Sequence, residues 1–416
     1  MSPKKIVILS NNYQPELTGP ASYITTLAEY LVSCGDSVTV LTSPPHYPHW
    51  KFYPGYGQSF YKRTQENGVD VVRGPLYVPA SPTALKRIAY DLSYTLSSLL
   101  KGVTLSQCDI VICVSPPLTI GLSAEILGFL KKCPFILHIM DLIPDAPVAL
   151  GMLKNRTIIS TLHRLEEHVY NSAGGIVAIT PGFSRNLKNK GIQNLEKIAL
   201  IPIWVDTDEI NPGVDGSEFR RQFNIPQEDF VITYSGNMGN KQGLETLIEA
   251  AALMPNGTAG NTRFLMVGEG AQKDYLYNLS KDYKLANTTF LPLMPRDQFP
   301  ALLAASDVLA ITQKKSVTDI CLPSKLISNC AAGKPIIAAV DDNSETAHFI
   351  SEAGCGVVSE PENPAALKNS IVTLHDHPNK AAQYGRNGRL HVENYYNKNK
   401  VLSAYRNFIH EVAQAS

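Results

Sequence analysis

The chain has 416 residues, of which 44% are hydrophobic and 18% charged, and its 37 basic and 37 acidic residues give a formal net charge of zero. This length predicts two domains of about 200 residues, each with an ordinary core. The neutral balance argues against a nucleic-acid-binding protein, and no apolar run reaches the roughly 18 residues that a membrane span needs. Seven scattered cysteines are typical of reduced residues in a cytoplasmic protein.

Short apolar runs rich in β-branched residues alternate with helical patterns along the whole chain. We expect strands at residues 5–9, 37–42, 69–72, 109–114, 134–140, 175–179, 199–203, 230–235, 263–267, 289–291, 308–311, 335–339 and 356–358. Runs that are apolar on both faces and separated by helices indicate parallel strands in doubly wound α/β domains. In such sheets ligands bind beyond the carboxyl ends of the strands.

The first helix and the domain boundary are the clearest local predictions. Apolar residues recur at helical spacing over residues 22–33, and Gly35 suits the C-terminal cap. A break near residues 201–206 is followed by a linker-like segment at 211–216. We therefore predict an N-terminal domain over residues 1–203 and a C-terminal domain over residues 204–390.

Two loops between strands and helices contain glycine. The loop at residues 11–22 contains Gly19, whose lack of a side chain would let backbone N–H groups approach a phosphate. A loop with one glycine is more often purely structural, and the absence of G-x-G-x-x-G argues against an NAD enzyme. The loop at residues 234–243 holds three glycines and Lys241, which predicts a diphosphate cradle or, alternatively, a glycine-rich turn with a solvated lysine.

Polar residues next to other strands and helices are further candidates. Ser324 and Lys325 begin a predicted helix, where an anion would be stabilised, although an ordinary helix entry has the same pattern. Asp141 follows a strand and is expected at the ligand-binding edge, whereas His138 inside that strand is more typical of a buried histidine. Asp206 and Asp208 form a D-x-D pattern without further clustered ligands, so we expect no metal.

Residues 81–100 predict a helix with Lys86 and Arg87 beside apolar residues. A basic, apolar helix of this kind either rests on a membrane surface or is a core helix with a solvated charged end. The sequence leaves both interpretations open.

Several motifs together resemble glycosyltransferase family 4, closest to the subgroup that makes colanic-acid-like and other bacterial exopolysaccharides and contains proteins assigned as fucosyltransferases. The motifs lie at residues 13–19, 44–48, 141–145, 203–206, 235–243, 323–325 and 332–335. The resemblance implies a GT-B fold, with two facing Rossmann-like domains and an interdomain cleft. It also implies that residues 391–416 form a terminal helix that crosses back to the N-terminal domain.

Carried over by motif, the resemblance implies two catalytic residues, Asp141 and Lys241. It implies donor contacts at Gly19, Gly236, Asn237, Lys241, Pro323, Ser324, Lys325 and Glu345, and acceptor contacts at Tyr13, Glu16, Tyr47 and His138. The reaction would retain the anomeric configuration, with a nucleotide sugar as co-substrate and no metal or other cofactor.

The chain departs from the family pattern at several positions. Asn237 stands where many members have an arginine, and an ungapped alignment puts Gln242 at the position of the usual lysine. The paired glutamates of the E-x7-E motif correspond to Ile320 and Ser328, which leaves Asp319 or Glu345 as candidates for the missing nucleotide contact.

The sequence therefore predicts a metal-independent hexosyl- or deoxyhexosyltransferase of bacterial exopolysaccharide biosynthesis. Its donor would be a GDP- or UDP-sugar and its acceptor a polyprenyl-diphosphate-linked saccharide at the inner face of the membrane. Lysine and N–H groups can stabilise the departing diphosphate without a metal. Two alternatives stay open, a nucleotide-sugar epimerase on the same fold and a non-catalytic nucleotide-sugar-binding scaffold.

Overall fold

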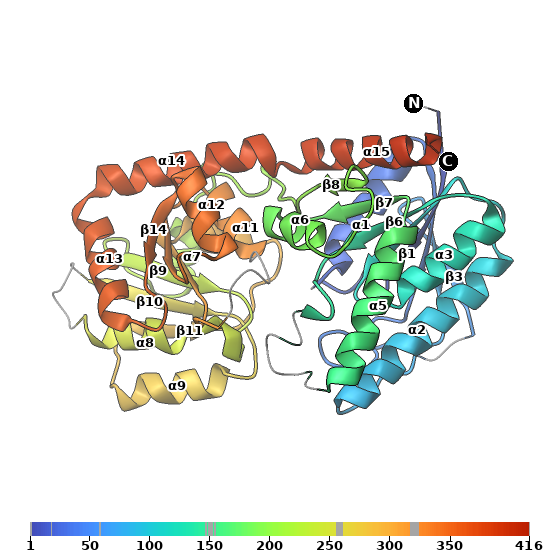
Figure 1. The fold of residues 1–416 in the computed structure, drawn as a ribbon. Helices are drawn as coiled ribbons and strands as arrows, with labels where there is room; N and C mark the ends of the chain where they lie inside the picture. Colours follow the sequence, from blue (N-terminus) through green and yellow to red (C-terminus); the bar gives the residue numbers. More distant parts are fainter. Residues whose placement is uncertain are drawn as a thin grey trace. The chain divides into compact units, whose positions relative to one another are not determined.

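The computed structural model describes residues 2–17, 19–57, 60–145, 148, 153, 155–254, 261–316 and 324–415 (Figure 1). The chain divides into two compact units, one formed by Met1–Ile203 with Val401–Ser416 and the other by Trp204–Lys400. Both are built of mostly parallel strands and covering helices. The cleft predicted between them stays a prediction.

The first unit contains an eight-stranded sheet in the order β3-β4-β2-β1-β5-β6-β7-β8. Its strands are β1 (Lys5–Leu9), β2 (Ser37–Thr42), β3 (Lys62–Glu66), β4 (Val69–Arg73), β5 (Ile110–Ser115), β6 (Phe135–Ile139), β7 (Gly175–Ala178) and β8 (Ile198–Leu200). Its helices include α1 (Ala21–Ser33), α2 (Ala84–Thr104), α3 (Ile120–Lys131), α5 (Arg156–Ser172) and α6 (Pro181–Lys188). The strand order reverses around β1, which pairs with both β2 and β5, and this is where such sheets bind ligands.

Strand β3 was not predicted from the sequence. It pairs antiparallel with β4 at the edge of the sheet, and its five residues KRTQE are polar. An edge strand has one unpaired side and tolerates charged residues that protect it from aggregation. Its polarity therefore hid it from a search for apolar runs.

The second unit contains a six-stranded parallel sheet in the order β11-β10-β9-β12-β13-β14. Its strands are β9 (Phe230–Ser235), β10 (Thr262–Val267), β11 (Thr288–Leu291), β12 (Val308–Thr312), β13 (Ile336–Ala339) and β14 (Gly356–Ser359). Its helices include α7 (Ser217–Gln222), the 3-10 turn η1 (Asn240–Gln242), α8 (Glu245–Ala252), α9 (Lys273–Asp282), α10 (Phe299–Ala304), α11 (Ser324–Ala331), α12 (Glu345–Ala353), α13 (Pro364–Asp376) and α14 (Pro378–Tyr395). Here the strand order reverses between β9 and β12.

The terminal helix begins later than the sequence suggested. Residues 391–395 belong to α14, and α15 runs over Lys398–Gln414. The break falls at Asn397, whose side-chain oxygen accepts hydrogen bonds from the backbone N–H groups of Asn399 (3.0 Å) and Lys400 (3.2 Å) and so caps α15. Within the first unit α15 packs on the sheet, where the Tyr405 hydroxyl lies 3.0 Å from His138 Nδ1.

Among the described residues, no helix is long and apolar enough to cross a membrane.

Candidate active site

In the first unit a buried carboxylate joins the loops that follow β1 and β2. Glu16 is 1% exposed, and its Oε1 accepts hydrogen bonds from the backbone N–H groups of His46 (2.6 Å) and Tyr47 (2.8 Å). Its Oε2 accepts from Asn12 Nδ2 at 2.7 Å. Glu16 therefore holds the loop that carries Tyr47, rather than presenting its own oxygens at the surface.

A chain of buried hydrogen bonds continues from this loop and assigns the tautomer of His46. Burial lowers the pKa of His46, so the ring is neutral at pH 7. Its Nδ1 faces the Pro44 carbonyl at 2.9 Å and must carry the proton, so Nε2 accepts from the Tyr90 hydroxyl at 2.8 Å. Asn11 Nδ2 donates to the same hydroxyl at 2.6 Å. The sequence did not predict this network, although His46 lies inside the motif at residues 44–48.

Tyr47 lies where several predicted residues meet. A Cβ on Gly19, which has φ +65°, would lie 3.9 Å from Tyr47 Cε1. Burial and then the Asp141 carboxylate raise the pKa of Tyr47, whereas the Arg87 guanidinium opposes that rise. Asp141 and Arg87 are exposed, and Tyr47 is 37% exposed. Gly19 therefore lies against Tyr47, and Asp141 and Arg87 lie near enough to shift the pKa of its phenol.

The other two residues of the predicted acceptor set are buried. Tyr13 is 2% exposed, and burial raises the pKa of its phenol. His138 lies within β6, where burial lowers its pKa to about 4, and it contacts Tyr405 of α15. These surroundings indicate structural roles, and an acceptor contact by either residue stays a prediction.

In the second unit the two predicted donor loops meet at one tyrosine. Lys325, at the start of α11, donates from Nζ to the Tyr234 hydroxyl at 2.7 Å and lies 4.0 Å from the centre of that ring. The Tyr234 hydroxyl donates in turn to the Asn237 carbonyl at 2.6 Å. A Cβ on Gly236, which has φ +141°, would lie 3.1 Å from the Lys325 ammonium. A cation is therefore held beside a glycine-rich turn.

Two helix N-termini and Lys241 complete this region. Ser324 is the exposed first residue of α11, and Glu345 is the buried first residue of α12, next to Ser344, which caps that helix. Lys241 is exposed on η1. The predicted contacts Pro323 and Asp319, like Ile320, lie outside the described residues.

The comparisons with known proteins agree with this geometry. Residues 18–204 match the Glycosyl transferase 4-like domain, and residues 215–391 match Glycosyl transferases group 1. WcaI of Escherichia coli K12, a glycosyl transferase assigned to colanic acid biosynthesis, is 32% identical over 422 residues, covering 98% of this chain and 99% of WcaI. The chain belongs to glycosyltransferase family 4.

Solved structures show that this family 4 chain has the GT-B fold. Sucrose-phosphate synthase from Thermosynechococcus elongatus superimposes with a TM-score of 0.78 at 18% identity, covering 99% of this chain and all of that one. The Anabaena protein HepE in complex with UDP-glucose gives a TM-score of 0.72 at 16% identity over 99% of this chain and 100% of HepE. The predicted glycosyltransferase activity and GT-B fold are confirmed.

The structure clarifies one departure from the family 4 pattern. Gln242 Oε1 accepts from the Gly239 N–H at 3.1 Å, and the Gln242 carbonyl accepts from Thr312 Oγ1 at 2.6 Å. Gln242 therefore braces the glycine-rich turn from inside. The neighbouring Lys241 is the exposed cation of this turn.

Two acidic groups in this family 4 chain resemble metal sites but hold other partners. Asp206 accepts from the backbone N–H groups of Asp208 (3.1 Å) and Glu209 (3.2 Å) and from Lys398 Nζ (2.5 Å), so it caps a turn. Ligand atoms of Asp145, His163 and Glu166 lie within 4.8 Å of one another. The Lys190 ammonium already contacts Asp145 at 2.8 Å and Glu166 at 2.5 Å, so a cation is present there without a metal.

Proposed function

We propose that this glycosyltransferase moves a hexosyl or deoxyhexosyl group from a GDP- or UDP-sugar to a polyprenyl-diphosphate-linked saccharide, with retention of configuration and without a metal. The observation that carries the donor side is the Lys325 ammonium held against Tyr234 beside Gly236. The UDP-glucose bound by HepE supports a nucleotide sugar as the donor. The exopolysaccharide assignment of WcaI supports the pathway.

The chemistry of this region suits a departing diphosphate. Breaking the anomeric bond develops negative charge on the β-phosphate, and Lys325 and Lys241 would neutralise that charge. The backbone N–H of Asn237 and those at the start of α11 would add hydrogen bonds, because a helix N-terminus favours anions. Lysines and N–H groups would supply what a divalent ion supplies in metal-dependent transferases.

The acceptor would bind at the Tyr47 cluster of the first unit. The exposed Asp141 carboxylate can accept hydrogen bonds from acceptor hydroxyls, and the exposed Arg87 guanidinium can pair with the diphosphate of a lipid-linked saccharide. Glu16 would act as a positioning residue, because it fixes the backbone of Tyr47. A lipid-linked acceptor would bring the enzyme to the inner face of the cell membrane, and nucleic acid has no part in this proposal.

The test combines binding with product analysis. We expect one of GDP, UDP, ADP and dTDP to raise the melting temperature selectively, and saturation at 100 times Kd adds about 2.7 kcal/mol. For a domain of this size that corresponds to roughly 5–10 °C. The variant Lys325→Gln should lose most of the shift. Lys380→Gln is the matched control, because Lys380 also lies over a tyrosine ring of the second unit, 5.7 Å from Tyr384.

Product analysis then separates the alternatives. A glycosylated lipid acceptor supports the proposal, whereas an interconverted nucleotide sugar would identify an epimerase. Selective nucleotide binding with neither product would favour the non-catalytic scaffold. That alternative rests on Ser328, which lies within α11 in place of a family glutamate. The absence of any nucleotide-dependent shift would contradict the donor site itself.

A further inference from the structure

Helix α2 has an apolar outer face in addition to the face that packs on the sheet. Tyr90 and Tyr94 point inward and are buried, whereas large apolar residues on the other side are exposed. These exposed residues, together with Phe60 and two residues of the neighbouring α3, form what we call the α2 surface: Phe60, Leu85, Ile88, Leu92, Leu96, Leu100, Val103, Phe129 and Leu130. Their exposed fractions run from 40% to 89%, and those on α2 recur every three or four residues, which places them on one face.

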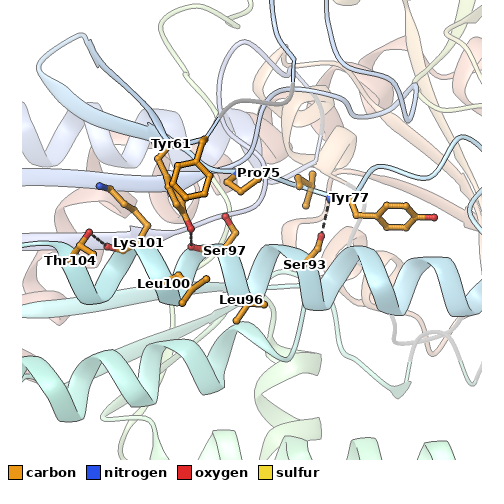
Figure 2. Close-up of a pocket in the computed structure, with 11 residues that line it drawn as sticks. Tyr61, Pro75, Tyr77, Ser93, Leu96, Ser97, Leu100, Lys101 and Thr104 are labelled. Carbon is orange, nitrogen blue, oxygen red and sulfur yellow. Dashed lines mark hydrogen bonds between the residues drawn. The ribbon is translucent and has the colours of Figure 1, made fainter.

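A groove runs along this helix. Its volume is about 760 Å³, and it extends from Tyr77 and Ser93 to Thr104. The helical rise of about 1.5 Å per residue gives the segment from Ser93 to Thr104 a length of roughly 16 Å. Figure 2 shows Tyr61 and Pro75 beside the helix, with the Tyr61 hydroxyl bonded to the Ser97 carbonyl at 2.9 Å. Most of the side chains that line the groove are apolar or aromatic.

Basic residues surround the apolar centre of this surface. Residues 60–63, α2 and residues 120–132 hold seven basic side chains and two acidic ones, Asp91 and Glu125, in a chain whose net charge is zero. One of the seven, Arg63, is paired with Asp70 at 2.6 Å, which leaves six basic side chains against the two acidic ones. The basic residues are Lys62, Arg63, Lys86, Arg87, Lys101, Lys131 and Lys132. Burial raises the pKa of Asp91 to about 7, which reduces its negative charge near neutral pH. The charge of this surface is therefore complementary to an anionic partner.

We infer that the α2 surface docks on an anionic lipid bilayer, with the groove receiving a lipid acyl chain. An apolar helix face bordered by lysine and arginine is the composition of helices that lie in the membrane interface. Apolar residues would enter the acyl boundary while the basic residues contact anionic headgroups. This inference rests on the proposed function in one respect: the lipid-linked acceptor is the reason for the enzyme to bind a membrane.

Vesicle sedimentation tests the inference with the full chain and without donor or acceptor. Phosphatidylglycerol vesicles should bind the protein, more weakly as salt increases, and phosphatidylcholine vesicles should bind it far less. Each basic residue near an anionic surface contributes about fivefold to the binding constant, so Lys86→Gln with Lys101→Gln should weaken binding about 25-fold. Leu96→Gln with Leu100→Gln should weaken it at least about tenfold.

The control variant carries Leu390→Gln and Tyr395→Gln on α14, where both residues are as exposed as Leu96 and Leu100. It should bind vesicles like the unmodified chain. The inference is overturned if phosphatidylglycerol vesicles leave the protein in solution, or if the Leu96 and Leu100 variant binds as well as the control. A dimer in sedimentation velocity that this variant abolishes, without vesicle binding, would instead identify a second copy as the occupant. Because this assay involves no transfer, its failure leaves the proposed transferase activity standing.

Discussion

The loop that carries Tyr47 should depend on the single buried carboxylate of Glu16. Replacing Glu16 by alanine leaves the backbone N–H groups of His46 and Tyr47 without their acceptor. Each unsatisfied buried N–H costs about 1–3 kcal/mol, so we expect the free energy of unfolding of the first unit to fall by about 2–6 kcal/mol. Glutamine keeps a neutral acceptor, and neutral hydrogen bonds are about half as strong as charged ones. Glu16→Gln should therefore lose roughly half as much.

Tryptophan fluorescence can follow this loop directly. The chain has two tryptophans, Trp50 and Trp204, so Trp204→Phe leaves Trp50 as the sole reporter. The Trp50 ring lies 5.1 Å from that of Tyr90, next to the network that Glu16 supports. Urea unfolding in this background should give the stability order Glu16, then glutamine, then alanine. The exposed Glu167→Gln in the same unit serves as the control.

Two results would refute this reasoning. The first is an alanine variant within about 1 kcal/mol of the Glu167→Gln control, because a lost pair of buried hydrogen bonds cannot cost so little. The second is a glutamine variant less stable than the alanine variant, which would mean that the site does not need an acceptor.

Three further predictions follow from the described contacts. The pKa of His138 in the folded protein is lowered to about 4, below the unfolded value near 6.5. The contribution of His138 to the free energy of unfolding is therefore complete above pH 6.5 and is lost as pH falls towards 4. In urea titrations over that range, wild type should lose up to about 3 kcal/mol more than His138→Gln. Gly236→Ala introduces a Cβ on a residue with φ +141°, 3.1 Å from Lys325 Nζ. It should therefore lower the free energy of unfolding by about 1–3 kcal/mol and weaken nucleotide binding in calorimetry. The control Gly57→Ala, whose Cβ would have no atom within 4 Å, should do neither. Dialysis against EDTA should leave the nucleotide-induced rise in melting temperature unchanged, and loss of that rise would contradict metal-independent binding.

Much of the fold could be predicted because strands buried on both faces of a parallel sheet have apolar runs in the sequence. β1, β2 and β9 lie at the predicted residues, and the other predicted strands differ by one residue at one or both ends, except β8, which ends three residues earlier than predicted. The polar edge strand β3 escaped because its stability comes from pairing with β4 rather than from burial. The break at Asn397 was also missed, since the helical pattern continues across it and only the side-chain cap divides α14 from α15.

The candidate site was predicted in its loops but not in its contacts. Gly236 and Lys325 stood out because they lie in loops that follow strands of one domain, although ordinary turns and helix entries share these patterns. Their meeting point, Tyr234, looked like an ordinary strand residue. Glu16 and His46 had the same limitation, since the bond between their loops spans 30 residues and depends on β1 and β2 being neighbours.

Strand order explains why Tyr234 and Lys325 meet. β9 ends at Ser235, and it pairs with β12 through Val308↔Ile232 and Leu309↔Thr233, although more than 70 residues separate the two strands. The segment after β12 leads to α11, so the start of α11 is delivered to the same edge of the sheet as the end of β9. This is the reversal point of the sheet, where two loops diverge and leave space for a ligand. Once the order β9-β12 is known, the placement of a cation from α11 beside the glycine-rich turn follows from the topology of the sheet.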